Sequence, residues 1–174
     1  ILDAWLAGNG LEELADPGAP FRAVAAECLE GNKRRASLSS LDKSIKVASQ
    51  PFRNQLVTIT LTGKQIKDML EQQWLDPKRP RILQVSKGFT YAWDSTKPDG
   101  ERVLPERMSL NGQPVDPAAS YRVTVNNFLF VGGDGFSVLT QGTAPLIGVY
   151  DSDALHAYFA ANSPVGPTAV DRIV

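Results

Sequence analysis

The chain has 174 residues, enough for one sizeable core, and its 43% hydrophobic and 21% charged residues are ordinary globular usage. Lys and Arg number 18 against 19 Asp and Glu, so the net charge gives no indication of binding to nucleic acid or to a membrane surface. The single cysteine excludes an internal disulfide and a cysteine-rich metal site, no apolar run is long enough for a membrane span, and the first residues show no signal-peptide pattern.

The first 49 residues contain no long periodic pattern. Apolar residues near the start have loosely helical spacing, residues 16–20 (DPGAP) indicate a turn or linker, and residues 31–40 are polar and basic. We therefore expect residues 1–49 to form an N-terminal segment of short helices and loops. A separate domain is expected over residues 50–174.

The next segment predicts a strand that leads directly into a helix. Apolar and polar residues alternate over residues 56–61, as in a half-buried strand. Thr62 and Gln65 have the spacing of a capping box, which predicts a helix over residues 63–74. The apolar face of this helix consists of Ile66, Met69 and Leu70. A further strand is expected over residues 82–93.

A hairpin, a third strand and a last helix complete the predicted elements. Asn111 and Gly112 stand between short apolar stretches, which is a strong hairpin signal. Asp151 or Ser152 caps the last helix. Because strands and helices do not alternate strictly, we expect an α+β fold, a single domain with a mixed β-sheet packed with helices. One sheet is expected to contain the strands near residues 55–61, 82–93 and 121–127.

The segment over residues 121–136 (YRVTVNNFLFVGGDGF) carries the clearest functional signal. An alternating strand ends in a loop where glycines flank Asp134, and glycine lets the backbone take positive φ and approach a ligand closely. Phe128 precedes this acid in the same strand-loop junction. An aromatic plane and a carboxylate suit a ligand with a flat ring and vicinal hydroxyls. The alternative interpretation is a tight turn with a core phenylalanine.

An ordered series of motifs joins this segment. The motifs follow one another along the chain in this order: residues 50–74, 83–91 and 110–117, the asparagine-phenylalanine-to-glycine-glycine-aspartate stretch, and the closing residues 153–164. The series resembles the C-terminal, substrate-binding domain of the 5'-nucleotidase family, which includes the periplasmic UDP-sugar hydrolases. The resemblance covers roughly residues 50–173 and implies the fold of that domain. It also implies an extracellular or periplasmic protein.

The resemblance implies roles for individual residues. Phe52 and Phe128 match two aromatic residues that stack on either side of the nucleobase, and any base offers a flat face for such stacking. Asp134 matches the acid that holds the ribose hydroxyls, and a carboxylate can accept two hydrogen bonds from a cis-diol. Asn54 matches a position that contacts the base edge.

Each of these residues also has a purely structural interpretation. The two phenylalanines could pack in the core, where most phenylalanines lie. Asp134 could hold its loop as an Asx-type turn residue, and Asn54 could simply form a turn at the strand entry.

The chain departs from the family pattern in its first part. An Asn-Gly-Gly-x-x-Arg segment whose arginine reaches the substrate phosphate is absent, so residues 1–49 are incomplete relative to the family. Arg35 lies in a stretch similar to the end of that segment and is a candidate phosphate ligand. A solvated basic loop is the alternative for Arg35. Pro80 stands where the family often has a glycine whose backbone meets the ligand.

The resemblance also implies a partner domain. Family members hydrolyse phosphate esters at two divalent metals held by an N-terminal metallophosphoesterase domain, and such a centre needs several ligands. This chain contains one histidine, His156, and no metal-ligand spacing, so we assign it no catalytic and no metal-binding residue. We expect the substrate-recognition domain of a 5'-nucleotidase-like hydrolase, inactive alone, that binds a nucleotide or nucleoside. A stand-alone nucleotide-binding module or an interaction module is the alternative.

Overall fold

The structure, a computed structural model, describes residues 52–76, 78–162 and 171–174. The predicted segment of residues 1–49 and the candidate phosphate ligand Arg35 lie outside this part of the chain.

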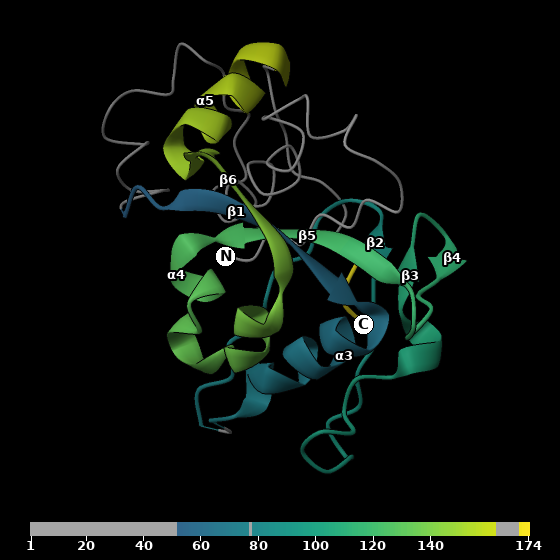
Figure 1. The fold of residues 1–174 in the computed structure, drawn as a ribbon. Coiled ribbons are helices and arrows are strands. Elements are labelled where there is room, and N and C mark those ends of the chain that lie inside the picture. Colours follow the sequence, from purple (N-terminus) through teal and green to yellow (C-terminus); the bar gives the residue numbers. More distant parts are fainter. Residues whose placement is uncertain (1–51, 77, 163–170) are drawn as a thin grey trace.

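A three-stranded antiparallel sheet forms the centre of the described structure (Figure 1). Its middle strand is β1 (Gln55–Thr62), which pairs with β5 (Ser120–Asn126) on one side and with β6 (Thr143–Tyr150) on the other. Both neighbours run antiparallel to β1. The start of β1 therefore lies at the same end of the sheet as the ends of β5 and β6.

The predicted capping box joins β1 to α3 (Gly63–Glu71). The Thr62 hydroxyl accepts a hydrogen bond from the Gln65 backbone N–H at 3.2 Å, and the Gln65 side chain accepts one from the Thr62 N–H at 2.8 Å. These two bonds satisfy donors that the first helical turn would otherwise leave unpaired. A single 3₁₀ turn, η5 (Gln72–Trp74), extends the helix, so the predicted strand–helix unit is confirmed.

The core lies between one face of the sheet and α3. Alternate residues of β1 point to this face, and Ile59 and Leu61 are completely buried there. The predicted apolar face of the helix is buried as well, because Ile66, Met69 and Leu70 have no exposed surface. The same cluster continues into β5, where Val123 and Val125 are buried, and into the segments that follow it.

A small second sheet lies beside this core. It consists of β2 (Phe89–Thr90), β3 (Ser109–Leu110) and β4 (Gln113–Pro114), in that order. Asn111 and Gly112 connect β3 and β4 with φ values of 50° and 78°. Positive φ at both central residues is the geometry of a type I′ hairpin turn, so the predicted hairpin is confirmed.

The prediction of a strand over residues 82–93 in the central sheet is wrong, both in the length of the strand and in the sheet to which it belongs. Only Phe89–Thr90 is a strand, and it pairs with β3 in the second sheet rather than with β1 or β5. Two features interrupt the segment. The backbone N–H of Leu83 donates to the side chain of Gln73 at 2.6 Å, and Gly88 takes a φ of 97° in a turn just before β2. Buried Leu83 and Val85 account for the strand-like pattern, because both side chains pack in the core although neither residue belongs to a strand of the central sheet.

Helices follow β5 and β6. The short α4 (Asn127–Phe130) begins at the end of β5, and the 3₁₀ turns η7 (Gly133–Gly135) and η8 (Ser137–Gln141) lead into β6. No sequence pattern predicted β6. The last helix, α5 (Asp151–Asn162), begins where it was expected.

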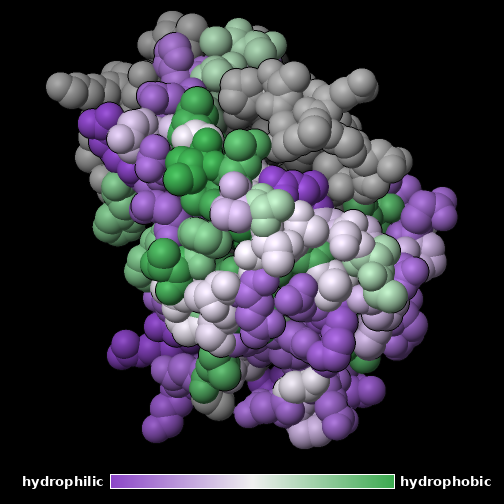
Figure 2. All heavy atoms as spheres, viewed as in Figure 1, coloured by the Kyte–Doolittle hydropathy of each residue, from purple (hydrophilic) through white to green (hydrophobic). Residues whose placement is uncertain are grey.

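The remaining short turn, η6 (Pro105–Arg107), precedes β3. The closing residues 171–174 return to the second sheet, where Ile173 pairs with Tyr91. Figure 2 shows apolar side chains gathered where β6 leads into α5, and the exposed apolar residues of that strand include Leu146, Ile147 and Val149.

One arginine ties the three strands of the central sheet together. The guanidinium of Arg122 on β5 donates to the Thr60 hydroxyl at 2.8 Å, to the Thr58 carbonyl at 3.2 Å and to the Ala144 carbonyl at 2.9 Å. Thr60 and Thr58 belong to β1 and Ala144 to β6. Arg122 therefore fixes β5 and β6 to the middle strand, and its partial burial lowers its pKa.

We predict that the capping box contributes measurably to folding. Thr62→Ala removes the hydroxyl that accepts from Gln65 and should lower the free energy of unfolding by about 0.5 to 2 kcal/mol. Thr62→Ser is the matched control, because serine keeps the hydroxyl, and it should retain most of the stability. Urea denaturation of the three proteins tests this. Equal losses in the alanine and serine variants would contradict the capping role.

Candidate functional site

Three of the predicted site residues, Phe52, Asn54 and Phe128, lie around the end of the sheet where β1 begins. Leu56 of β1 pairs with Asn126 at the end of β5, and Gln55 pairs with Tyr150 at the end of β6. Phe52 precedes β1 and Phe128 follows β5, so the antiparallel register brings both to this end. Figure 1 shows α4, which carries Phe128, beside the start of β1.

Neither phenylalanine belongs to the core. Phe52 is 82% exposed and Phe128 is 47% exposed, whereas Phe89, Phe136 and Phe159 are almost completely buried. The core-packing alternative therefore fails for both candidate residues. How the two rings face each other stays a prediction.

Asn54 is held by a reciprocal pair of hydrogen bonds with Asp151, the first residue of α5. The Asn54 N–H donates to the Asp151 carboxylate at 3.2 Å, and the Asp151 N–H donates to the Asn54 carbonyl at 2.9 Å. The N–H of Ser152 donates to the other carboxylate oxygen at 2.6 Å. These bonds fix the backbone of Asn54 and leave its side-chain amide without a hydrogen bond to the described part of the chain.

The carboxyl of Asp151 is almost fully buried, with 3% of the residue exposed. Burial raises its pKa above the ordinary value, and the two backbone N–H donors oppose that rise. Asp151 therefore holds the entry of β1 at the cost of keeping a carboxylate away from water.

Arg53, between the two candidate residues, has a left-handed backbone. Its φ is 48°, a region in which residues other than glycine are uncommon. Its guanidinium lies over the ring of Tyr150, 5.1 Å from the ring centroid. This contact and the Asp151 bonds hold the turn that leaves Phe52 exposed.

Phe128 is positioned by the first turn of α4 and by the glycine loop. The side chain of Asn126 caps α4 by accepting from the Leu129 N–H at 2.8 Å, and Leu129 is buried beneath the helix. A Cβ placed on Gly133 would lie 2.6 Å from Cε1 of Phe128 and 2.5 Å from its carbonyl oxygen. Only glycine therefore lets the loop fold back against the Phe128 ring.

Asp134 lies at the centre of this loop. Its φ of 55° and ψ of 16° are left-handed, and its side chain is about half exposed. Arg81 approaches it twice: Nε lies 3.5 Å from Oδ1, and Nη1 donates to the Asp134 carbonyl at 3.2 Å. Phe128 and Asp134 are thus brought together by one loop, and an arginine distant in sequence contacts that loop.

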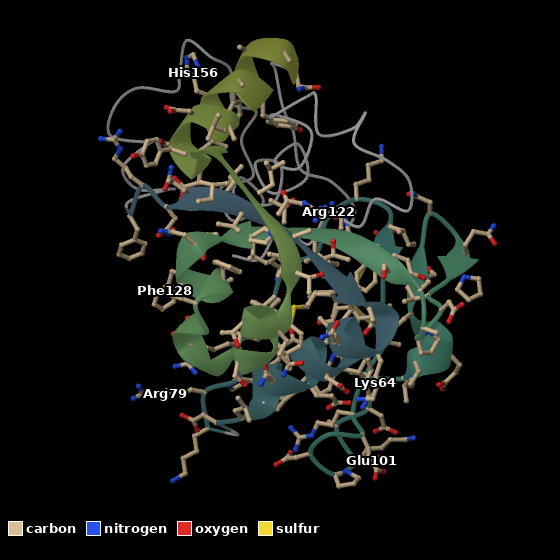
Figure 3. All side chains as sticks on the ribbon, in the orientation of Figure 1. Lys64, Arg79, Glu101, Arg122, Phe128 and His156 are labelled. Carbon is tan, nitrogen blue, oxygen red and sulfur yellow. The ribbon has the colours of Figure 1, made fainter. Side chains whose placement is uncertain are left out.

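His156, the one histidine of the sequence, was assigned no role. His156 is exposed on α5 and lies at the top of Figure 3, away from Phe128 beside α4. Within residues 52–76, 78–162 and 171–174, no three His, Cys, Asp or Glu side chains form a group that could hold a metal ion. No helix in this same part of the chain is long and apolar enough to cross a membrane.

Arg81 and Asp151 were missed by the sequence analysis. Asp151 was considered only as a helix cap, and its contact with Asn54 joins residues 97 apart. Arg81 meets Asp134 across 53 residues. Neither contact leaves a local spacing signal. The only sequence feature near Arg81 was Pro80, which was interpreted as standing where the family often has a glycine.

Comparison with protein families and known structures shows the relatives of this chain. The model described as "5'-nucleotidase, C-terminal domain" matches residues 44–141. The chain is 40% identical to the trifunctional nucleotide phosphoesterase protein YfkN of Bacillus subtilis over 101 residues, which are 53% of this chain and 7% of that protein. It is 36% identical to the cell wall protein Lmo0130 of Listeria monocytogenes over 107 residues, 61% of this chain and 13% of that protein.

A similar solved structure is a 5'-nucleotidase precursor from Thermus thermophilus. The TM-score is 0.64 at 32% sequence identity, over 79% of this chain and 27% of that one. The chain thus spans less than a third of the length of each of these relatives.

We predict a pH-dependent contribution of Asp151 to stability. The pKa of its carboxyl is higher in the folded state than the value of about 3.9 expected in the unfolded chain, so the folded state binds this proton more tightly. Its contribution is complete below the unfolded pKa and is lost as the pH rises through the folded pKa. Wild-type stability, measured relative to Asp151→Asn, should therefore fall as the pH rises above about 3.9.

Urea denaturation at a series of pH values measures this difference. Asp153→Asn is the matched control, because it removes a negative charge from the same helical turn at an exposed position. A wild-type advantage over Asp151→Asn that grows with pH would contradict the prediction.

Proposed function

Because the chain belongs to the family of 5'-nucleotidase C-terminal domains, we propose that it is the substrate-recognition domain of a 5'-nucleotidase-like phosphoester hydrolase. Its ligand is a nucleotide or nucleoside. The base lies between Phe52 and Phe128, and Asp134 holds the ribose hydroxyls. The observation that carries this proposal is the exposed ring of Phe128 folded against the loop that presents Asp134.

Stacking explains why two large aromatic side chains remain exposed at one end of the sheet. A base–aromatic contact contributes about 1 to 3 kcal/mol and accepts any base, because every base has a flat face. The Phe128 ring packs directly against the backbone of Gly133, which leaves no room for a side chain at that position. Phe52 is presented at the same end of the β1–β5 ladder by the turn at Arg53.

The loop suits recognition of a sugar with two free hydroxyls. A carboxylate has two oxygens with several lone pairs, so Asp134 can accept hydrogen bonds from both hydroxyls of a ribose. The glycines on either side carry no side chain that would block the sugar. Asn54 lies at the same end of the sheet, and its amide offers a donor and an acceptor for a base edge. Arg35 remains the candidate phosphate ligand.

Hydrolysis requires chemistry that the described residues do not contain. We place it at two divalent metals held by an N-terminal metallophosphoesterase domain, which would polarise the phosphate and activate a water. The greater length of the relatives, one of which is named a nucleotide phosphoesterase, supports such a partner domain. An extracellular or periplasmic location is proposed on the family resemblance and on the name of the Listeria cell wall protein.

We predict that the binding residues have separable effects. Phe52→Ala and Phe128→Ala should each weaken nucleoside binding by about 1 to 3 kcal/mol for any base. Asp134→Ala should instead remove the preference for ribose over deoxyribose. Isothermal titration calorimetry with adenosine, guanosine and 2'-deoxyadenosine measures these effects.

Val131→Ala is the matched control for this series, because Val131 is an exposed apolar residue in the loop between Phe128 and Asp134. It should bind as the wild type does. Binding that is present but unaffected by all three site substitutions would place the pocket elsewhere. No nucleoside binding by the wild type would favour an interaction module instead.

We also predict that this chain alone does not release phosphate from AMP, with or without added Mn²⁺, Mg²⁺ or Zn²⁺. The reason is the absence of a metal-ligand group among the described residues and of a second histidine anywhere in the sequence. A colorimetric phosphate assay on protein freed of contaminating phosphatases measures this. Metal-dependent turnover that follows the protein through purification would contradict the assignment.

A further inference from the structure

We propose that Arg81 is a positioning residue for ribose recognition, acting through Asp134. This inference rests on the proposed role of Asp134 as the ligand of the ribose hydroxyls. Arg81 contacts both parts of that residue: Nε lies 3.5 Å from the carboxylate, and Nη1 donates to the carbonyl at 3.2 Å. A single side chain thus fixes the backbone and the carboxylate of Asp134 together.

The backbone of Asp134 needs such support. Its left-handed conformation is uncommon for a residue with a side chain, and such conformations persist when surrounding contacts determine them. The nearby Gly132 and Gly135 also have positive φ values, 86° and 88°, and neither contributes a side chain that could hold the loop. The Arg81 bond to the Asp134 carbonyl supplies a contact from outside the loop.

Arg81 belongs to a segment that contacts the loop at several points. The side chain of Gln72 donates to the Ser137 hydroxyl at 2.8 Å and accepts from the Val138 N–H at 3.1 Å. Gly135 packs so closely on Leu75 that an added Cβ would lie 3.3 Å from Cδ1. Gln72, Leu75 and Arg81 therefore support the glycine loop and the η8 turn that follows it, with Arg81 at the contact with Asp134.

Arg81 is itself anchored to the core. The Arg81 N–H donates to the Gln73 carbonyl at 2.9 Å, and the Gln73 side chain accepts from the Leu83 N–H at 2.6 Å. Gln73 is buried, so the backbone on both sides of Ile82 is fixed to the protein interior. The guanidinium can therefore hold Asp134 from a defined position.

The contact leaves Asp134 able to bind a sugar. An ionised carboxylate has about four lone-pair sites, and Arg81 Nε occupies one of them at most. Both ribose hydroxyls can still be accepted. Because the carboxylate is held before the ligand arrives, less conformational freedom is lost on binding. Arg81 should therefore strengthen binding of ligands with ribose hydroxyls and have little effect on ligands without them.

The test compares adenosine with 2',3'-dideoxyadenosine, which lacks both hydroxyls. Calorimetry is run on the wild type, Arg81→Ala, Arg81→Lys, Asp134→Ala and the double variant Arg81→Ala with Asp134→Ala. Arg79→Ala is the matched control. Arg79 is exposed in the same segment and projects outward at the lower left of Figure 3.

Arg81→Ala should weaken adenosine binding about threefold to tenfold and change dideoxyadenosine binding by less than about twofold. Arg81→Lys should recover part of the loss, because an ammonium can approach the carboxylate but cannot also reproduce the planar contact with the carbonyl. In the Asp134→Ala background, removing Arg81 should have no further effect on the preference for adenosine over dideoxyadenosine, because the carboxylate that Arg81 positions is already absent. Arg79→Ala should behave as the wild type does.

Three results would overturn the proposal. Equal weakening of both nucleosides by Arg81→Ala indicates a purely structural role. Unchanged adenosine binding in a folded Arg81→Ala variant removes the role of Arg81 and leaves the proposed function intact. Failure of the wild type to bind either nucleoside removes the proposed function and the role of Arg81 together.

Discussion

Antiparallel pairing of β1 on both of its edges is the constraint on which the rest of the structure depends. One face of β1 supplies the centre of the core, and its last residue caps α3. At its other end, the same pairing gathers the turn before β1, the loop after β5 and the first residue of α5. Segments that are distant in sequence but lie at the same end of the sheet therefore form the candidate site.

Polar contacts help to hold this end of the sheet, in addition to buried side chains such as Leu129. Asp151 fixes Asn54 through paired backbone bonds, and Arg81 fixes Asp134. Two residues there, Arg53 and Asp134, have left-handed backbones that cost free energy. Asp134 is held by Arg81, whose backbone is bonded to Gln73 of η5, the turn that extends the core helix α3. Rigid secondary structure thus presents exposed aromatic and carboxylate groups, as expected for a binding site on loops above a scaffold.

Local patterns were sufficient to predict part of the fold. The Thr62–Gln65 box and the Asn111–Gly112 turn depend on neighbouring residues, and both were found where expected. The strand over residues 82–93 was wrong because Leu83 and Val85 are buried by tertiary packing that mimics a strand pattern. Strand β6 was missed because it is an exposed, irregular edge containing Pro145 and a left-handed Ala144. The family resemblance supplied the candidate site residues, whereas Arg81 and Asp151 required the three-dimensional contacts.

The central claim is that one nucleoside lies between Phe52 and Phe128 with its ribose on Asp134. A crystal structure of this chain grown with adenosine tests it most directly. The account predicts the adenine between the two rings, which would then lie about 7 to 8 Å apart as two van der Waals contacts require. The ribose hydroxyls should be within hydrogen-bond distance of the Asp134 carboxylate. Adenosine bound elsewhere, or rings that do not face each other across the base, would contradict the account.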